Sequence, residues 1–377
     1  MVSSLDRLRD QLKRRGVATD VIDWWGRHRR ALPWRALAGA KPDPYRVWLS
    51  EVLLQQTTAT GAAPYFLEFV RRWPTVEALG AAPLEAVMQS FAGLGYYSRA
   101  RNLHACAQAV AAAGGQFPRR EADLLRLPGI GPYTAAAIAA IAFDEAAAPI
   151  DGNIARILSR LMAFETPVAR NRPALESAAV ALTPLSRPGD YAQALMDIGA
   201  TICRPRNPDC ERCPLARACL GRRAGAPESF PSKGERKARP ARVGAAFYVE
   251  RADGAFLARR RPPRGLLGST MELPGGSWVE GEIQAVDASA APFAASWRRL
   301  PGYVEHVFTH FSLRLALYAA PAPSASAPPG MVWINPNDIG SSGFSGLMKK
   351  AALSAASEFR SPAFKRRSNA PSAKTRS

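Results

Sequence analysis

Residues 127–134 read LPGIGPYT and are the segment of the sequence most informative about the fold. It joins two segments whose apolar residues recur with the 3.6-residue period of an α-helix. Gly129 and Gly131 tolerate positive φ and a close backbone approach, so successive backbone N–H groups can face a phosphate at the start of the second helix. The stretch predicts two helices joined by a phosphate-binding turn, although many helix–helix connections need glycine for the turn alone.

Helical periodicity continues on both sides of this turn, over about residues 5–220. Thr19 and Asp20 are expected to open one helix, and Asp43 the next, because Pro44 suits a first helical turn. We therefore expect an α-helical region over residues 1–225.

The second part of the chain has a different pattern. Residues 226–242 are rich in Gly, Pro, Arg and Lys and predict a basic linker. The apolar period then becomes two, and Asp253-Gly254 is a strong hairpin signal. The expected strands are 243–250, 255–260, 303–310 and 313–320, and the expected closing helix is 345–359. We predict a smaller α+β domain over residues 243–360 and a disordered basic tail over residues 361–377.

Composition indicates the kind of partner. The 377 residues carry a formal net charge of +19, which usually means a polyanionic partner, most often nucleic acid. A membrane surface is the alternative, but the sequence has no apolar run long enough to span a bilayer and no signal peptide pattern over residues 1–19. We expect a monomeric, cytoplasmic protein associated with the nucleoid.

Four of the five cysteines fall between residues 203 and 219, as Cys203-x6-Cys210-x2-Cys213-x5-Cys219. Four thiolates in one loop can hold either tetrahedral zinc or a cubic iron–sulfur cluster, and the spacing alone leaves both open. Arg204 and Arg206 lie between the first two cysteines, where a rigid metal loop would press them against DNA phosphates. The alternative for these two arginines is a solvated charged loop.

Two acidic residues are candidates for acid–base and electrostatic catalysis, in which one group supplies a proton and the other a negative charge near a developing cation. Glu51 shares a helical face with Val47, Trp48 and Leu54, and apolar neighbours raise a carboxyl pKa toward that of a general acid. The alternative is a core glutamate satisfied by a helix terminus or an arginine. Asp151 precedes a helix, so its ordinary interpretation is an N-cap, which is compatible with electrostatic catalysis.

These motifs together resemble the endonuclease III/MutY superfamily, and most closely the adenine DNA glycosylases of the MutY type. The similar segments are residues 44–57, 93–103, 127–134, 150–153 and the helix 192–199 that precedes the cysteines. The resemblance covers roughly residues 15–320. It implies a helix-hairpin-helix glycosylase fold with a [4Fe–4S] cluster in the loop 203–219.

The resemblance also implies catalytic roles. Glu51 would protonate adenine at N7, Asp151 would stabilise the sugar cation or its covalent successor, and Asn153 would orient that aspartate or the water. Family members that also cut the DNA backbone have a lysine where this chain has Tyr133. A phenol cannot form a Schiff base, so Tyr133 joins the catalytic set as the residue that favours simple hydrolysis.

Further residues match the family's DNA contacts. Tyr96 would wedge beside the oxidised guanine, while Gln55 and Gln56 match strand-invading and adenine-reading residues. Arg30, Trp34 and Arg35 resemble pocket-lining residues. The chain departs from the family by about four extra residues between Arg35 and Pro44.

Residues 244–276 resemble a MutT-like (Nudix) fold. The REXXEE run that binds magnesium in active pyrophosphohydrolases is missing, because residues 277–291 offer only Glu280, Glu282 and Asp287. Hydrolysis of nucleotides therefore looks lost. The domain matches the lesion-reading domain of MutY, with Phe308, Thr309 and His310 where the family has Phe-Ser-His.

The function expected from the sequence is a monofunctional glycosylase that removes adenine mispaired with 8-oxoguanine or guanine in duplex DNA. The alternatives are a bifunctional endonuclease III-like lyase, a catalytically inactive iron–sulfur DNA-binding protein and a nucleotide pyrophosphohydrolase. Tyr133 argues against the lyase, and the intact Glu51 and Asp151 argue against an inactive protein. The missing metal motif argues against the pyrophosphohydrolase. The sequence does not identify a sliding clamp or mismatch-repair partner.

Overall fold

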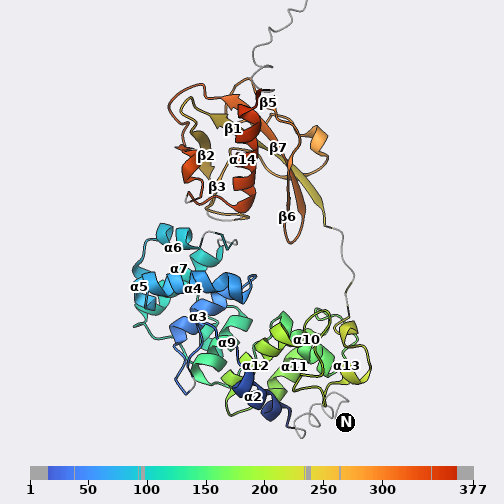
Figure 1. Ribbon diagram of the computed structural model, residues 1–377. Coiled ribbons are helices and arrows are strands. Elements are labelled where there is room, and N and C mark those ends of the chain that lie inside the picture. The colour runs from blue at the N-terminus through green and yellow to red at the C-terminus, as the bar shows by residue number, and fades with distance from the viewer. Residues whose placement is uncertain are drawn as a thin grey trace, which may run out of the picture. The chain divides into compact units, whose positions relative to one another are not determined.

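The computed structural model describes residues 16–37, 39–91, 93–94, 98–232, 234, 239–262, 265–340 and 342–362. The chain divides into two compact units, coloured from blue to red along the chain in Figure 1. One comprises Met1–Leu84 with Arg101–Arg236, and the other comprises Glu85–Ala100 with Lys237–Ser377. The first is helical in its described residues and the second holds the sheet, which confirms the predicted fold class. The domain limits predicted at 225, 242 and 360 stay predictions.

The helices of the first part follow one another with short connections. In chain order they are α2 (Val17–His28), α3 (Pro44–Leu54), α4 (Ala59–Arg72), α5 (Val76–Ala81), α6 (Leu84–Ser90), α7 (Ser98–Ala112), α8 (Glu121–Leu124), α9 (Pro132–Phe143), α10 (Gly152–Leu161), α11 (Arg172–Leu182), α12 (Pro188–Thr201), α13 (Leu220–Arg223) and the 3₁₀ helix η1 (Pro227–Ser229).

Local sequence explains the start of α3 but not that of α2. Asp43 caps α3 by accepting a hydrogen bond from the Tyr45 amide at 2.9 Å, as predicted. The start predicted for the previous helix at Thr19 is wrong. That helix begins at Val17, because Gly16 adopts the left-handed conformation at its N-cap.

Helix α9 forms the centre of the helical unit, where it packs between α3 and α12 (Figure 1). Its residues 134–140 are all buried, and six of these seven side chains are no larger than threonine, since five are alanine. A Cβ at Gly189 of α12 would come within 2.4 Å of the Ala140 carbonyl oxygen. Small residues on both helices therefore allow the close crossing that brings the ends of α3, α9 and α10 to one cavity.

The second unit is built on an eight-stranded mixed sheet. The strands are β1 (Ala241–Glu250), β2 (Phe256–Arg260), β3 (Met271–Glu272), β4 (Val279–Glu280), β5 (Arg298–Arg299), β6 (Val304–Val307), β7 (Ser312–Pro321) and β8 (Met331–Ile334). The path runs β3-β2-β1-β7-β5, with β4 on β1, β6 on β7 and β8 on β2. Strands β1 and β7 pair in parallel over their whole length.

Both faces of this sheet are covered. Ala246 and Tyr248 of β1 pack toward α14 (Gly346–Arg360), while Ala245 and Phe247 pack toward the opposite side with the 3₁₀ helix η2 (Ile283–Ala285). Figure 1 shows α14 lying along the sheet. The predicted strands 243–250, 255–260 and 313–320 and the closing helix are confirmed. The strand predicted over 303–310 is shorter, because a turn over residues 308–311 interrupts it.

Candidate active site and DNA interface

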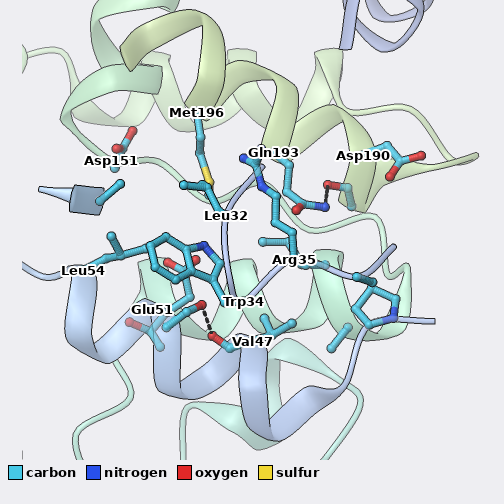
Figure 2. A pocket seen from close by; sticks show the side chains of 18 of the residues that line it. Leu32, Trp34, Arg35, Val47, Glu51, Leu54, Asp151, Asp190, Gln193 and Met196 are labelled. Carbon is cyan, nitrogen blue, oxygen red and sulfur yellow. Dashed lines mark hydrogen bonds between the residues drawn. The ribbon is translucent and has the colours of Figure 1, made fainter. Parts of the chain in front are cut away.

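A cavity of about 1770 Å³ opens in the helical unit. Its walls come from the segment after α2, the end of α3, the starts of α9 and α10, and one face of α12. Figure 2 shows Glu51 pointing into it beside Trp34, with Asp151 across the space. The volume exceeds that of a single nucleobase, so a flipped nucleotide with part of its backbone could enter.

Glu51 lies on α3 and is only 4 % exposed. Its Oε2 atom is buried and has no hydrogen-bond partner among the described residues. Burial raises the pKa of Glu51 to about 7; a hydrogen bond from Tyr133 and the charge of Arg35 oppose this rise, and the charge of Asp151 adds to it. The carboxyl group is therefore not a core glutamate satisfied by an arginine, and near neutral pH much of it is protonated.

Tyr133 lies in the first turn of α9, directly after the glycine turn. Its hydroxyl forms a hydrogen bond with Glu51, and burial, followed by the charges of Glu51 and Asp151, raises the pKa of this phenol well above its ordinary value. The phenol therefore stays protonated and can donate a hydrogen bond to the carboxyl group. The Tyr133 side chain thus links the glycine turn to Glu51 on α3.

Asp151 is the N-cap of α10, and it also lines the cavity. Its Oδ1 accepts a hydrogen bond from the Ile154 amide at 2.7 Å, and its Oδ2 accepts one from Nδ2 of Asn153 at 2.9 Å. The N-cap interpretation is therefore confirmed, since the cap uses one oxygen while Asn153 holds the other. The catalytic role of Asp151 stays a prediction.

Arg156 extends this contact chain, and sequence reasoning missed it. Its guanidinium donates to Oδ1 of Asn153 at 2.8 Å, to the Cys203 carbonyl at 2.8 Å and to the Gly199 carbonyl at 2.8 Å. The sequence feature that could have indicated this contact is the position of Arg156, three residues after Asn153 on the same helix. The residue connects the cavity to the cysteine loop.

Arg30, Trp34 and Arg35 all line the cavity, as the resemblance implied. The two arginines are held by Asp197, whose side chain is fully buried; Arg35 donates to both of its oxygens at 2.7 and 2.8 Å. Burial alone would raise the pKa of Asp197, but the two guanidinium groups outweigh it and lower that pKa. Asp197 is a second residue to which the sequence had given no role.

The glycine turn uses its two glycines differently. Gly129 has φ +73°, and a Cβ there would come within 2.5 Å of the Asn102 Cβ. Gly131 caps α9 with an extended backbone at φ −91° and has open space around its Cβ position. Only Gly129 therefore needs the positive φ that the sequence suggested for both. Both glycines border the cavity.

Gln55 and Gln56 follow α3 at the edge of the cavity. Gln55 donates to the Thr134 hydroxyl at 3.4 Å, and Gln56 is exposed with a left-handed backbone at φ +59°. Tyr96 lies outside the described residues, so its wedge role stays a prediction.

The four cysteines Cys203, Cys210, Cys213 and Cys219 all lie on the loop between α12 and α13. Burial is the main reason that the pKa of Cys213 is raised to about 12; the charges of the other three thiols add to the rise and a hydrogen bond from the Leu215 backbone opposes it. Four thiolates this close would repel one another unless a cation lay between them, so the donor set suits a metal group. In the described part of the chain, no three His, Cys, Asp or Glu side chains already meet the geometry of a metal-ion site. Arg204 and Arg206 are exposed on this loop.

In the sheet unit, Phe308, Thr309 and His310 form the tip of the β6–β7 hairpin. The Phe308 amide donates to the Phe311 carbonyl at 2.8 Å, and Thr309 and His310 are exposed. The Phe308 ring packs against Trp278, with ring centroids 5.7 Å apart. Between β4 and β5 the described chain has η2 but no α-helix.

Comparison with known proteins agrees with this geometry. A family model described as HhH-GPD superfamily base excision DNA repair protein matches residues 49–175, and one described as NUDIX domain matches residues 245–353. The fold and site thus define a helix-hairpin-helix base-excision repair protein with a Nudix domain.

Individual relatives narrow the class. Adenine DNA glycosylase of Homo sapiens is 33 % identical over 93 % of this chain and 76 % of its own length, and that of Mus musculus is 32 % identical over 88 % and 76 %. The solved structure of a thermostable thymine-DNA glycosylase has a TM-score of 0.51 and 30 % identity, covering 57 % of this chain and 99 % of that one. This chain belongs to the adenine DNA glycosylase family, hydrolases of the N-glycosidic bond that act on DNA. In the described residues, none of the helices has the length and apolar character needed to cross a membrane.

Proposed function

We propose that the chain hydrolyses the N-glycosidic bond of adenine placed opposite 8-oxoguanine or guanine in duplex DNA, without cutting the backbone. The observation that carries the proposal is the buried Glu51 carboxyl group, whose pKa of about 7 and unpartnered Oε2 equip it to give a proton to a base in the cavity. The net charge of +19 supports a protein that acts at the nucleoid, and we retain a monomer as the expected state.

The reaction would begin when adenine is flipped into the cavity, at a cost of a few kcal/mol. Glu51 donates its proton to N7 of the base, and the C1′–N9 bond breaks with its electron pair moving to the adenine. Asp151, held by Asn153, stabilises the cationic sugar by its negative charge. Water then adds to C1′ and its proton restores the Glu51 carboxyl group.

Tyr133 fits the first step as a positioning residue. Its hydrogen bond orients the Glu51 carboxyl group while leaving Oε2 open to the base. Because a phenol is not an amine, no Schiff base can form at this position. Borohydride trapping should give little covalent adduct, and a strong adduct with the wild-type protein would favour the lyase alternative.

We propose that Cys203, Cys210, Cys213 and Cys219 hold a [4Fe–4S] cluster. When bound, the cluster would cross-link the loop and so hold its exposed Arg204 and Arg206 against DNA phosphates. Gly129 and Gly131 would present backbone N–H groups to a phosphate on the other side of the cavity. Metal analysis tests the cluster directly: about four irons per chain are expected, and one zinc without iron would refute it.

Lesion recognition is proposed for the β6–β7 tip, where the Thr309 hydroxyl and His310 are exposed on a rigid aromatic base. Gln55, Gln56 and Tyr96 would fill the gap left by the flipped base and read its surroundings.

The central test compares Glu51→Gln with Glu68→Gln, which changes an exposed glutamate of α4. Glu51→Gln should bind duplex DNA normally and release adenine at least a hundredfold more slowly, since an amide keeps the shape but has no acidic proton. Glu68→Gln should behave as wild type. Substantial single-turnover release by Glu51→Gln would overturn the assignment of the acid.

A further inference from the structure

The chain that leaves the helical unit lies against the cysteine loop. Glu228 of η1 accepts a hydrogen bond from the Asn207 amide at 2.8 Å, and the Phe230 carbonyl accepts one from Nε of Arg160 at 3.0 Å. Gly221 makes room for this contact, because a Cβ there would come within 3.2 Å of the Phe230 ring and 2.9 Å of the Arg160 carbonyl oxygen. We call residues 226–230 the connector anchor.

Arg160 joins the anchor to the loop. The residue is 2 % exposed, and besides Phe230 its guanidinium donates to the Arg204 carbonyl at 2.7 Å, the Pro205 carbonyl at 3.0 Å and Sγ of Cys203 at 3.3 Å. A buried cation is tolerated only while such acceptors surround it. Three of its four acceptors belong to the loop, so Arg160 can hold Phe230 only while the loop keeps its shape.

We infer that the cysteine loop is the docking site of the connector anchor, that Arg160 is the positioning residue between them, and that loss of the metal group frees the anchor. This inference rests on the proposed metal group in the loop. It does not depend on whether that group is an iron–sulfur cluster or zinc, since either would cross-link the same four thiolates.

Hydrogen exchange of the full chain, followed by mass spectrometry, tests the docking. Peptides covering 226–230 and 205–209 should exchange about tenfold faster in metal-depleted protein than in metal-loaded protein, because the hydrogen bonds of the anchor are lost. The double variant Glu228→Ala/Phe230→Ala should accelerate exchange in 226–230 similarly while its metal content stays that of wild type. Glu211→Ala is the matched control, since it removes an exposed acid from the same loop.

Two outcomes would overturn the inference: equal exchange of 226–230 in loaded and depleted protein, or a double variant that exchanges like Glu211→Ala. If metal removal unfolds the whole helical unit, exchange will also become faster across α3. In that case the metal-loaded double variant is compared with metal-loaded Glu211→Ala, and this comparison decides whether the anchor docks. Adenine release and metal content are measured separately on wild-type protein. Failure of the proposed reaction would appear there and leave the exchange result unaffected.

Discussion

At the scale of single residues, the burial that suits Glu51 to its proposed role as the acid also weakens the fold. Its burial among apolar side chains makes the charged form costly, which keeps a proton available near pH 7. The same burial leaves Oε2 without a partner among the described residues. A carboxyl group in this position is a stability cost accepted for activity.

The pH dependence of adenine release should follow this carboxyl group. Because the protonated form is the acid, kcat/KM should be level below pH 7 and fall about tenfold per pH unit above it. Single-turnover assays between pH 5.5 and 9 on 8-oxoG:A duplex measure this directly. Glu51→Gln should show a low rate that is flat through the same range, whereas a wild-type rate unchanged up to pH 9 would exclude Glu51 as the acid.

The stability difference between Glu51→Gln and wild type should also depend on pH. The folded pKa of about 7 lies above the unfolded value of 4.5, so the folded protein binds this proton more tightly. The stability that the group contributes is therefore complete below pH 4.5 and is lost as pH rises to about 7. Chemical denaturation should show the glutamine variant gaining roughly 3 kcal/mol relative to wild type between pH 4.5 and 8. A difference that does not change with pH would contradict the burial argument.

At the scale of elements, the starts of α9 and α10 and the end of α3 meet at one cavity. Tyr133 connects α9 to Glu51, and Asn153 with Arg156 connects Asp151 to the cysteine loop. Each helix therefore contributes its terminal residues to the site, where backbone groups and side chains are free of the helical hydrogen-bond pattern.

The glycine turn before α9 allows a matched test. Gly129→Ala should destabilise the protein by about 1–3 kcal/mol, because a Cβ would strain the backbone at φ +73° and clash with Asn102. Gly131→Ala should change stability by less than about 0.5 kcal/mol, because its backbone is extended and its Cβ position is open. Thermal or urea denaturation compares the two. Equal effects would show that the turn does not depend on the left-handed conformation at Gly129.

At the scale of the whole molecule, the residues proposed for catalysis and those proposed for lesion reading belong to different units. Glu51, Asp151, the glycine turn and the cysteine loop all lie in the helical unit, whereas the Phe308–His310 tip lies in the sheet unit. Chemistry and discrimination are therefore expected to respond to different substitutions.

Thr309→Val keeps the shape of the hairpin tip and removes its hydroxyl group. If that hydroxyl contacts the lesion, the ratio of adenine release from 8-oxoG:A and G:A duplexes should fall about tenfold, since a lost polar contact costs about 1–3 kcal/mol. Release from G:A duplex should stay within about twofold of wild type. Thr201→Val, on α12 of the helical unit, is the control. An unchanged ratio would place lesion recognition elsewhere.

The sequence by itself determined the local features. The glycine turn at 127–134 was readable because positive φ at Gly129 restricts residue choice, and the cysteine spacing was readable because the ligands are close in the chain. Strands β1, β2 and β7 and helix α14 followed from period and turn signals. The start of α2 could not be predicted in this way, because its N-cap is the left-handed Gly16, which has no capping side chain.

Only the tertiary structure decided which groups meet. Asp197 engages Arg30 and Arg35 across more than 160 residues of chain, and Arg160 reaches Phe230 across 70. No periodicity encodes such pairs, because they depend on how helices cross around α9. The pKa of Glu51 has the same origin. Apolar neighbours on its own helix indicated that this pKa would be raised, but the size of the rise depends on the cavity wall and on Tyr133, which comes from another helix.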